Sequence, residues 1–265
     1  MLIVIKGAGD LATGVALRLW RAGIRLVMTD LEEPSAIRRT VAFSECMRLG
    51  ETTVEGITAR RAKDVTDALA ILEQGMIPVL ADPTAKCIPL LQPDAVVDVI
   101  LAKYNTGTAI TDAPVVIGVG PGFTAKVDCH AVVETQRGHR LGRVILDGSA
   151  APNTGRPGNV GGYTIERLIR SHRAGVFTCV RAIGDTVEAN EVVGTIDGEP
   201  VRCEIGGILR GLLPDGFHVP KAGFKSGDVD PRCEYENCFT ASDKALSVGG
   251  GVLEAVLMLT GALKK

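Results

Sequence analysis

Short apolar runs alternate with amphipathic stretches in the first part of the chain. Leu2–Ile5 is apolar throughout, and Leu11–Trp20 repeats apolar residues at helical spacing. A second apolar run, Ile24–Met28, follows after a glycine. The pattern therefore predicts a strand, a turn, a helix and a second strand, in that order.

The same alternation continues to about residue 100. The spacing predicts a helix over Asp64–Gln74, and strands over Ile77–Leu80 and Ala95–Ile100. Val115–Val119 is a further apolar run of the kind found in buried strands. We expect an α/β unit with a parallel sheet at the N-terminus of the chain.

The first turn carries a glycine motif. Gly7-Ala8-Gly9-Asp10-Leu11-Ala12 matches G-x-G-x-x-A, and Asp30 lies 21 residues beyond Gly9 at the end of the second strand. In such a motif Gly7 permits the tight turn, Gly9 lets a pyrophosphate approach the backbone, and Ala12 keeps helix and strand close. The motif predicts a Rossmann-like unit that binds a nucleotide, with the Asp30 carboxylate on the ribose hydroxyls.

Acidic residues around this motif affect which nucleotide fits. A 2′-phosphate would meet Asp30, Glu32 and Glu33 together, which favours NAD over NADP. Asp10 adds negative charge where a pyrophosphate would lie. A Rossmann-like fold whose glycines serve packing and whose pocket is empty or altered therefore stays open as an alternative.

Further candidate residues follow the later strands. Asp82 and Asp98 come at strand ends, where ligands bind in open parallel sheets, although capping of a turn explains them equally well. The segment Gly118–Lys126 is a glycine loop with a hydroxyl and a lysine, but its spacing differs from that of a triphosphate-binding loop. The candidate cofactor-binding residues are Gly7, Gly9, Asp10, Ala12, Asp30, Asp82, Gly120, Gly122, Thr124, Lys126, Asn153 and Thr154.

The middle of the chain contains a second candidate ligand loop. Asp147–Gly162 is dense in Gly, Pro, Asn and Ser, and includes the polar residues Asn153 and Thr154. Tyr163–His172, which follows, shows helical periodicity and predicts a helix.

Short β-type runs alternate with turns from Val180 onward. The pattern of Gly184–Val187, followed by Gly207–Gly211, is similar to that of biotinyl and lipoyl carrier domains, but the turn Asp197–Pro200 lacks the lysine of a carrier. We expect a barrel-sandwich unit at about 180–232 without a swinging arm. The predicted domains are a nucleotide-binding domain at 1–112, a mixed domain at 113–240 that contains this unit, and a C-terminal helix at 241–265 packed on the core.

Two features near the C-terminus remain. Asp228 and Asp230 lie at i and i+2, on one face of an extended chain, as a divalent cation or a general acid and base would require, and turn chemistry explains them equally well. Gly249–Gly251 precedes an apolar stretch, Val252–Leu259, that predicts a buried final helix with Gly261 and Lys264-Lys265 as stop signals. Close packing is the expected use of the three glycines.

The composition of the chain limits the kinds of partner that we expect it to bind. The chain has 29 Lys and Arg against 31 Asp and Glu, a net charge of −2, so we expect no general attraction to nucleic acid or an anionic membrane. No apolar run approaches the roughly 20 residues of a membrane span, and no secretory signal is visible, which predicts a cytoplasmic protein. The seven cysteines are scattered without a CxxC pair, as is typical of reduced thiols, and they indicate no metal site.

Several stretches of sequence carry a resemblance to a known family. They are Ile5–Gly14, Arg38–Ser44, Ala113–Thr124, Gly227–Arg232, and Ser242–Lys244 with Gly249–Ala255. Together they resemble the YqeB-like accessory proteins of selenium-dependent molybdenum hydroxylase systems in bacteria, over nearly the whole chain. The nucleotide-binding half is also distantly similar to xanthine dehydrogenase accessory factors.

The resemblance implies a role in maturing or loading a molybdenum hydroxylase, with the apo-enzyme or other maturation factors as partners. It also implies a cofactor that contains a nucleotide, either NAD or a molybdopterin dinucleotide. It supplies no catalytic residue, so whether the chain is an enzyme stays open, as does homo-oligomer formation. The alternatives are an NAD-dependent oxidoreductase, which Asp30 favours, and a non-enzymatic scaffold that docks the apo-hydroxylase.

Overall fold

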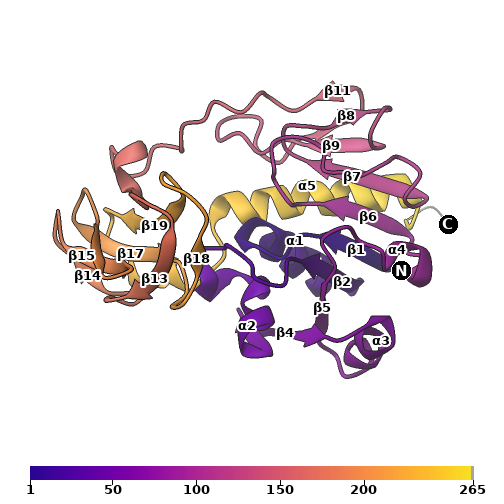
Figure 1. The fold of residues 1–265 in the computed structure, drawn as a ribbon. Coiled ribbons are helices and arrows are strands. Elements are labelled where there is room, and N and C mark those ends of the chain that lie inside the picture. Colours follow the sequence, from indigo (N-terminus) through magenta and orange to yellow (C-terminus); the bar gives the residue numbers. More distant parts are fainter. Residues whose placement is uncertain (264–265) are drawn as a thin grey trace. The chain divides into compact units, whose positions relative to one another are not determined.

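The computed structural model describes residues 1–263, so the predicted stop signal Lys264-Lys265 lies outside the described residues. The chain forms two compact units (Figure 1). The first comprises residues 1–34, 42–154 and the segment from 241 onward, and the second comprises Ser35–Val41 and Gly155–Thr240. These limits differ from the expected ones because residues 113–154 extend the N-terminal sheet and do not open a second domain.

One large sheet organises the first unit. Within residues 1–263 it has nine strands, in the order β10-β9-β7-β6-β1-β2-β5-β4-β3. The strands are β1 Leu2–Lys6, β2 Arg25–Asp30, β3 Glu51–Val54, β4 Ile57–Ala62, β5 Ile77–Ala81, β6 Ala95–Asp98, β7 Val115–Val119, β9 Ala131–Val133 and β10 Val144–Ile145. Neighbours from β4 to β9 pair in parallel, whereas β3 and β10 pair antiparallel at the two edges. The carboxyl ends of the parallel strands therefore meet along one edge.

The strands and helices predicted for the first hundred residues are confirmed to within two residues at their ends. The helices of this unit are α1 Asp10–Arg21, α2 Cys46–Leu49, α3 Val65–Glu73, α4 Ile88–Leu91 and α5 Asp243–Thr260, with a 3-10 turn at Phe43–Glu45. The Asp64 side chain caps α3 by accepting a hydrogen bond of 2.9 Å from the N–H of Asp67. Helices α3 and α4 share one apolar core with a face of the sheet that includes Val4 and Val96. The hairpin of β3 and β4 has no counterpart among the predicted elements.

The final helix, α5, lies along α1 at the distance of backbone contact (Figure 1). A Cβ atom at Gly14 would lie 2.5 Å from that of Ala245, and one at Gly249 would lie 2.7 Å from the Gly14 carbonyl oxygen. The prediction of close packing is confirmed for Gly249 and Gly251 and is wrong for Gly250, where a Cβ atom would have no neighbour within 4 Å. The helix is longer than the expected Val252–Leu259, because it begins at Asp243, directly after the N-cap Ser242, whose hydroxyl accepts a hydrogen bond of 3.2 Å from the N–H of Ala245.

The second unit is built from two antiparallel sheets of four strands each in its described residues, β12-β19-β17-β14 and β16-β15-β13-β18. The strands are β12 Leu168–Arg170, β13 Gly175–Cys179, β14 Thr186–Val187, β15 Val192–Ile196, β16 Glu199–Arg202, β17 Gly207–Leu212, β18 His218–Val219 and β19 Lys225–Asp230. Side chains from both sheets, among them Phe177, Leu209 and Val229, form one apolar core. The β-rich character is confirmed, and the likeness to biotinyl and lipoyl carrier domains stays a prediction.

The helix predicted over Tyr163–His172 is wrong. A 3-10 turn at Ile165–Arg167 leads directly into β12, where Leu168 pairs with Asp228 of β19. Leu168 and Ile169 are buried in β12, whereas Ile165 in the preceding turn is 48% exposed. The apolar residues at helical spacing therefore do not form one buried helix face. Pairing with β19 outweighs the local periodicity, since a short apolar segment fits either structure.

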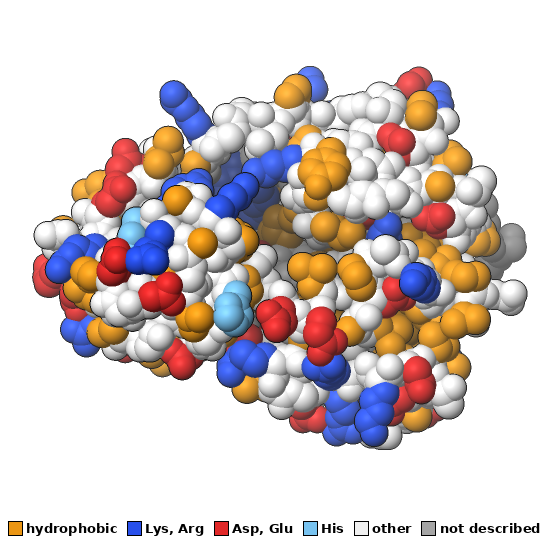
Figure 2. Space-filling view, in the orientation of Figure 1, with side chains coloured by type: hydrophobic (Ala, Val, Ile, Leu, Met, Phe, Trp, Pro, Cys, Tyr) orange, Lys and Arg blue, Asp and Glu red, His pale blue; other side chains and the backbone are white. Residues whose placement is uncertain are grey.

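The surface shows no single dominant charge on the face seen in Figure 2, where acidic and basic side chains both occur over the two units. This distribution matches the small net charge of −2. Among the helices of residues 1–263, none combines the length and the apolar character that crossing a membrane requires.

The contact between α1 and α5 predicts opposite effects for two adjacent glycines. Gly249→Ala should destabilise the protein by about 1 to 3 kcal/mol, because the new methyl group meets the backbone of α1. Gly250→Ala should stabilise it by up to about 1 kcal/mol, because a Cβ atom there has no neighbour within 4 Å and alanine favours the helix. Urea denaturation of both variants measures the difference, and equal effects would contradict the packing described here.

Candidate functional site

The carboxyl edge of the parallel sheet gathers most of the candidate residues. Strand β1 lies between β2 and β6, and the chain passes from β5 to the other side of β1, so the strand order reverses at β1 and β6. Ligands of open parallel sheets bind outside the carboxyl ends of the strands at such a point. The candidates found at this edge are Gly7, Gly9, Asp10 and Ala12 after β1, Asp30 at the end of β2, Asp82 after β5, and Gly120 and Gly122 after β7.

The glycine loop has the backbone geometry that its sequence predicts. Gly7 has a φ of +98°, and a Cβ atom there would lie 2.9 Å from the carbonyl oxygen of Val99. Gly9 is the N-cap of α1, without a side-chain cap, and a Cβ atom there would have no neighbour within 4 Å. Ala12 is buried. The first turn of α1 therefore starts beside open space, at the position where a Rossmann-like loop holds an anion.

Asp30 is hydrogen-bonded to the backbone of the glycine loop. Its carboxylate accepts one hydrogen bond of 2.8 Å from the N–H of Ala8 and another of 2.7 Å from the N–H of Leu31. Burial raises the pKa of Asp30, and these two hydrogen bonds oppose the rise. Because a carboxylate oxygen can accept more than one hydrogen bond, Asp30 retains acceptor capacity for a ribose hydroxyl.

Asp82 has a local structural role. Its carboxylate accepts a hydrogen bond of 2.8 Å from the N–H of Cys87, which is the N-cap residue of α4. This is the capping role that the sequence left open beside ligand binding.

Asp98 belongs to a buried polar network that no sequence motif indicates. Thr108 donates a hydrogen bond of 2.6 Å to Asp98 Oδ2 and accepts one of 2.5 Å from the Lys6 ammonium, which lies 3.6 Å from the same carboxylate oxygen. Each of the three residues is no more than 3% exposed. The network ties the long connection after β6 to the end of β1, next to Gly7. The one available signal for Lys6 is its place between an apolar strand and the glycine loop.

Lys244 brings positive charge to the start of α1. Burial lowers the pKa of Lys244 and Arg137 acts in the same direction, whereas the negative charges of Asp10, Glu134 and Asp243 raise it. A lysine in the first turn of a helix opposes the helix dipole, so its position is not explained by helix stability. Its charge offsets that of Asp10, the residue that would otherwise repel a phosphate.

The loop with Asn153 and Thr154 is attached to the end of β9. Glu134, which is 4% exposed, accepts a hydrogen bond of 2.8 Å from the N–H of Ala151 and others from the backbone that follows β9. Asn153 and Thr154 are themselves exposed. The Ala151 contact places this loop at the same sheet edge as the glycine loop.

Thr124 and Lys126 are engaged elsewhere. They belong to the turn around β8 Thr124–Ala125, which pairs with β11 Gly148–Ser149. Thr124 forms a hydroxyl hydrogen bond of 2.9 Å with Ser149, and Lys126 forms an exposed ion pair of 2.8 Å with Asp147. In these contacts Gly118–Lys126 forms a structural turn, and its lysine is paired with Asp147.

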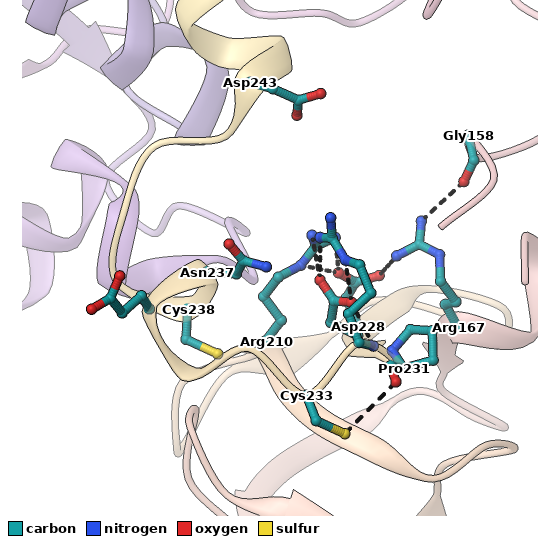
Figure 3. A network of polar contacts seen from close by, with 12 residues as sticks. Gly158, Arg167, Arg210, Asp228, Pro231, Cys233, Asn237, Cys238 and Asp243 are labelled. Atoms are coloured by element: carbon teal, nitrogen blue, oxygen red, sulfur yellow. Dashed lines mark hydrogen bonds and ion pairs between the residues drawn. The ribbon is translucent and has the colours of Figure 1, made fainter. Parts of the chain in front are cut away.

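A second polar cluster lies within the β-rich unit (Figure 3). Asp228 and Asp230 point to one face of β19, as their spacing predicts, and are 2% and 0% exposed. The contacts within the cluster are Arg167 Nη1 to Asp228 Oδ1 at 2.7 Å, Arg210 Nε and Nη2 to Asp228 Oδ2 at 2.8 and 2.5 Å, Arg210 Nη1 to Asp230 Oδ2 at 3.1 Å, and Arg232 Nε and Nη2 to Asp230 Oδ1 and Oδ2 at 2.9 and 2.6 Å. Guanidinium groups thus occupy the positions expected for a divalent cation.

The thiols differ in their surroundings. The seven cysteines all lie among the described residues, and none of them forms a disulfide bond. Burial, reinforced by the charges of Asp30 and Asp82, raises the pKa of Cys46 and Cys87 to about 12. Such thiols stay protonated and unreactive at neutral pH. Cys233 is the exposed one.

The cluster around Asp230 predicts a dependence of stability on pH. Burial alone would raise the pKa of Asp230, but hydrogen bonds from Arg232 and the charges of Arg210 and Arg232 hold it below its usual value. A carboxyl group whose pKa is lowered on folding stabilises the protein above its unfolded pKa of about 3.9, and that stabilisation is lost as the pH falls through the folded value. The wild-type protein should therefore lose free energy of unfolding below about pH 4.

Asp230→Asn tests this assignment. The variant should lose about 3 to 5 kcal/mol at pH 7, because the buried guanidinium group of Arg210 loses one of its two counter-charges, and should lose less on further acidification than the wild type. Glu199→Gln removes an exposed partner of Arg173 and should cost less than about 1 kcal/mol. Urea denaturation at pH 7 and pH 3.5 measures both. A small effect of Asp230→Asn at pH 7 would show that the cluster is not a stabilising one.

The chain is similar to a curated protein from Escherichia coli (strain K12), "Uncharacterized protein YqeB", with 50% identity over 258 residues. The matched region covers 97% of this chain and 48% of YqeB, so the chain spans about half the length of that relative. The similarity supports the YqeB-like relationship that the motifs indicate, and it brings no role in a hydroxylase system, because YqeB is itself described as uncharacterized. No model of a known protein family matches the chain.

Two solved structures show a distant likeness. One is an aspartoacylase family protein from Mesorhizobium loti, with 11% identity, a TM-score of 0.27, and coverage of 86% of this chain and 83% of that one. The other is the product-bound ectoine utilization protein EutE (DoeB) from Ruegeria pomeroyi, with 12% identity, a TM-score of 0.25, and coverage of 86% and 84%. Scores this low do not establish a shared fold.

Proposed function

We propose that this chain binds a nucleotide-containing cofactor at the carboxyl ends of β1 and β6, and that it serves as an accessory protein in maturing a selenium-dependent molybdenum hydroxylase. The ligand part of the proposal is carried by the open start of α1 at Gly9. The role in maturation is supported by the sequence motifs that resemble the YqeB-like accessory proteins.

The start of α1 offers hydrogen-bond donors to an anion. The first bond within the helix runs from the N–H of Thr13 to the carbonyl of Gly9, at 2.8 Å. Helix geometry therefore leaves the N–H groups of Leu11 and Ala12 without an acceptor in the helix. They lie at the positive end of the helix dipole, beside the space left by Gly9. A diphosphate group of a nucleotide is the ligand that this arrangement suits.

Charges near the loop allow such an anion to bind. Asp10 disfavours a phosphate, but Lys244 contributes a positive charge within electrostatic range of Asp10. Asp30 supplies acceptors for ribose hydroxyls and would repel a 2′-phosphate. The combination suits a dinucleotide with free ribose hydroxyls, which includes NAD and a molybdopterin dinucleotide.

The β-rich unit is the proposed docking element. We interpret its two sheets as a barrel-sandwich of the biotinyl and lipoyl carrier type, whose hairpin turn Asp197-Gly198 carries no lysine for a prosthetic group. Without that lysine the unit has no site for a swinging arm. In the scaffold alternative this unit is the adaptor that binds the apo-hydroxylase. That role is compatible with nucleotide binding by the first unit.

Gly9→Asp tests the ligand site. Thermal unfolding is measured with NADH, NADPH, CMP, CTP and molybdopterin cytosine dinucleotide. A ligand at about 100 times its Kd adds roughly 2.7 kcal/mol and should raise the Tm of the wild type by roughly 5 to 10 °C. Gly9→Asp should abolish this increase without lowering the Tm of the free protein, because Gly9 has an ordinary φ of −66° and space for a side chain.

Gly250→Asp is the matched control. Gly250 also lacks neighbours within 4 Å and a positive φ, but it lies about two turns into α5. This variant should keep the full increase in Tm. An equal increase in Gly9→Asp would contradict the site. An increase with NADH alone would favour the oxidoreductase, and none with any ligand would favour the docking scaffold.

The maturation role has a separate test in cells. Cells that lack the chain should accumulate the molybdenum hydroxylase without its cofactor, and the purified enzyme should contain less molybdenum by elemental mass spectrometry. A Gly9→Asp copy should fail to restore the metal content, whereas a Gly250→Asp copy should restore it. Full molybdenum content in the deletion strain would contradict the proposed role.

A further inference from the structure

The last residues of β1 and β6 carry opposite charges, although the rest of both strands is apolar. Lys6 ends β1 and Asp98 ends β6, and the two residues are paired in register on neighbouring parallel strands. Together with Thr108, from the connection between β6 and β7, they form one buried network, and each is no more than 3% exposed. The charges therefore occur at the position of each strand that leads into a loop at the proposed nucleotide site.

Stability alone does not account for a charged pair at this depth. Removing Lys6 and Asp98 from water costs desolvation free energy that their attraction offsets only in part, and apolar side chains of similar volume are often at least as stabilising. The preceding residues of the two strands, Ile5 and Val97, are apolar and fully buried. What the charged pair adds is a fixed arrangement of the groups that are hydrogen-bonded to it.

The threonine hydroxyl connects the two charges. An ammonium group only donates hydrogen bonds, and a carboxylate only accepts them. Thr108 Oγ1 must therefore accept from Lys6, at 2.5 Å, and donate to Asp98 Oδ2, at 2.6 Å. Loss of this one hydroxyl would break both hydrogen bonds. The connection between β6 and β7 is thus attached at Thr108 to the ends of β1 and β6.

The beginning of the same connection packs against the glycine loop. The N–H of Val99 donates a hydrogen bond of 2.8 Å to the carbonyl of Lys6. The N–H of Ile100 donates one of 3.0 Å to Asp98 Oδ1. The carbonyl oxygen of Val99 lies so close to Gly7 that a Cβ atom there would be 2.9 Å away. Displacement of the connection would therefore remove the backbone against which Gly7 packs.

The backbone between these two attachments is strained. Leu101 has a φ of +61° and Lys103 a φ of +71°, in the left-handed region that residues with a side chain rarely adopt. Such conformations persist where the surrounding structure holds them, and they cluster at sites that bind ligands. The network holds the segment 99–108 at both ends, because Asp98 accepts hydrogen bonds from Ile100 and from Thr108.

We propose that Lys6, Thr108 and Asp98 are positioning residues of the nucleotide site. They clamp the segment 99–108 against Gly7 and thereby keep the glycine loop in the conformation that presents the start of α1 to a diphosphate group. Their side chains are buried, so they act through the loop and do not touch the nucleotide. The inference rests on the proposed function and extends it to the residues that prepare the site.

Replacement of the charged pair by a neutral pair of similar size is the direct test. Lys6→Met with Asp98→Asn removes both charges together, and the amide oxygen of the new side chain can still accept from Ile100. The Tm should stay within roughly 5 °C of the wild type, because no unpaired charge is left buried. Amide hydrogen exchange in residues 7–12 and 99–108 should be faster by about 10-fold, whereas exchange in β5 should be unchanged.

The same double variant should bind nucleotides more weakly. Isothermal titration calorimetry is carried out with NADH, CTP and molybdopterin cytosine dinucleotide. Each of these that binds the wild type should bind the double variant about 10-fold more weakly, because apparent affinity falls with the fraction of the protein whose loop has the binding conformation. A role in stability alone would lower the Tm and leave the affinity of the folded protein unchanged.

Two substitutions of Thr108 separate the effect of its hydroxyl from that of its methyl group. Thr108→Val keeps the shape and loses the hydroxyl, so it should reproduce the faster exchange and the weaker binding of the double variant. Thr108→Ser keeps the hydroxyl and should behave as the wild type in both measurements. This pair keeps the test decisive if the double variant does not fold.

Glu51→Gln with Arg60→Gln is the matched control. It removes an ion pair of 2.8 Å from the same sheet, between β3 and β4, where both side chains are partly exposed. Because this pair lies at the far edge of the sheet from β6, exchange in residues 7–12 and 99–108 should equal that of the wild type. Nucleotide affinity should also be unchanged.

The outcomes separate the clamp from the nucleotide site. Faster exchange in both loops together with weaker binding supports the proposal. Unchanged exchange in the double variant and in Thr108→Val overturns the clamp, and faster exchange with unchanged affinity overturns its role in positioning. Binding of no nucleotide by the wild type overturns the proposed function and with it the positioning of a ligand, but leaves the exchange test of the clamp valid.

Discussion

The backbone contact between α1 and α5 is the constraint on which the first unit depends. Gly14, Ala245 and Gly249 allow the two helices to approach more closely than larger side chains permit. This contact brings the last helix of the described chain against the first one. As a result, the first turn of α5 carries Lys244 into the electrostatic environment of Asp10. Larger residues at this contact would hold α5 farther from α1, and the positive charge of Lys244 would then lie farther from the negative charge of Asp10.

The parallel sheet adds a second constraint. Because its strands run in one direction, side chains that follow different strands lie along one edge although they are far apart in sequence. The glycine loop, Asp30 and Glu134 reach this edge in that way. The carboxylates of Asp30 and Glu134 are already hydrogen-bonded to backbone N–H groups, so these two acids hold the loops in place. The groups at this edge that are left for a ligand are the N–H groups at the open start of α1 and the remaining lone pairs of the Asp30 carboxylate.

The β-rich unit uses charge differently. Buried ion pairs are not in general a strong source of stability, since desolvation offsets much of the attraction. In this unit the two aspartates hold the guanidinium group of Arg210 at both edges, which fixes its orientation. A local pattern of two carboxylates is compatible with a cation site, but guanidinium groups occupy the positions that such a cation would take.

The amino-acid sequence by itself determined the strands and helices of the first hundred residues, the geometry of the glycine loop and the close packing of Gly249. These features depend on local periodicity and on backbone conformations that only glycine adopts easily, which can be recognised from neighbouring residues. Tertiary structure decided that Leu168 lies in a strand and not in a helix, because its partner strand β19 is some 60 residues away. It also decided the partners of Lys6, Lys244 and Asp228. Such long-range pairings depend on which strands and helices become neighbours, and no local pattern encodes that choice.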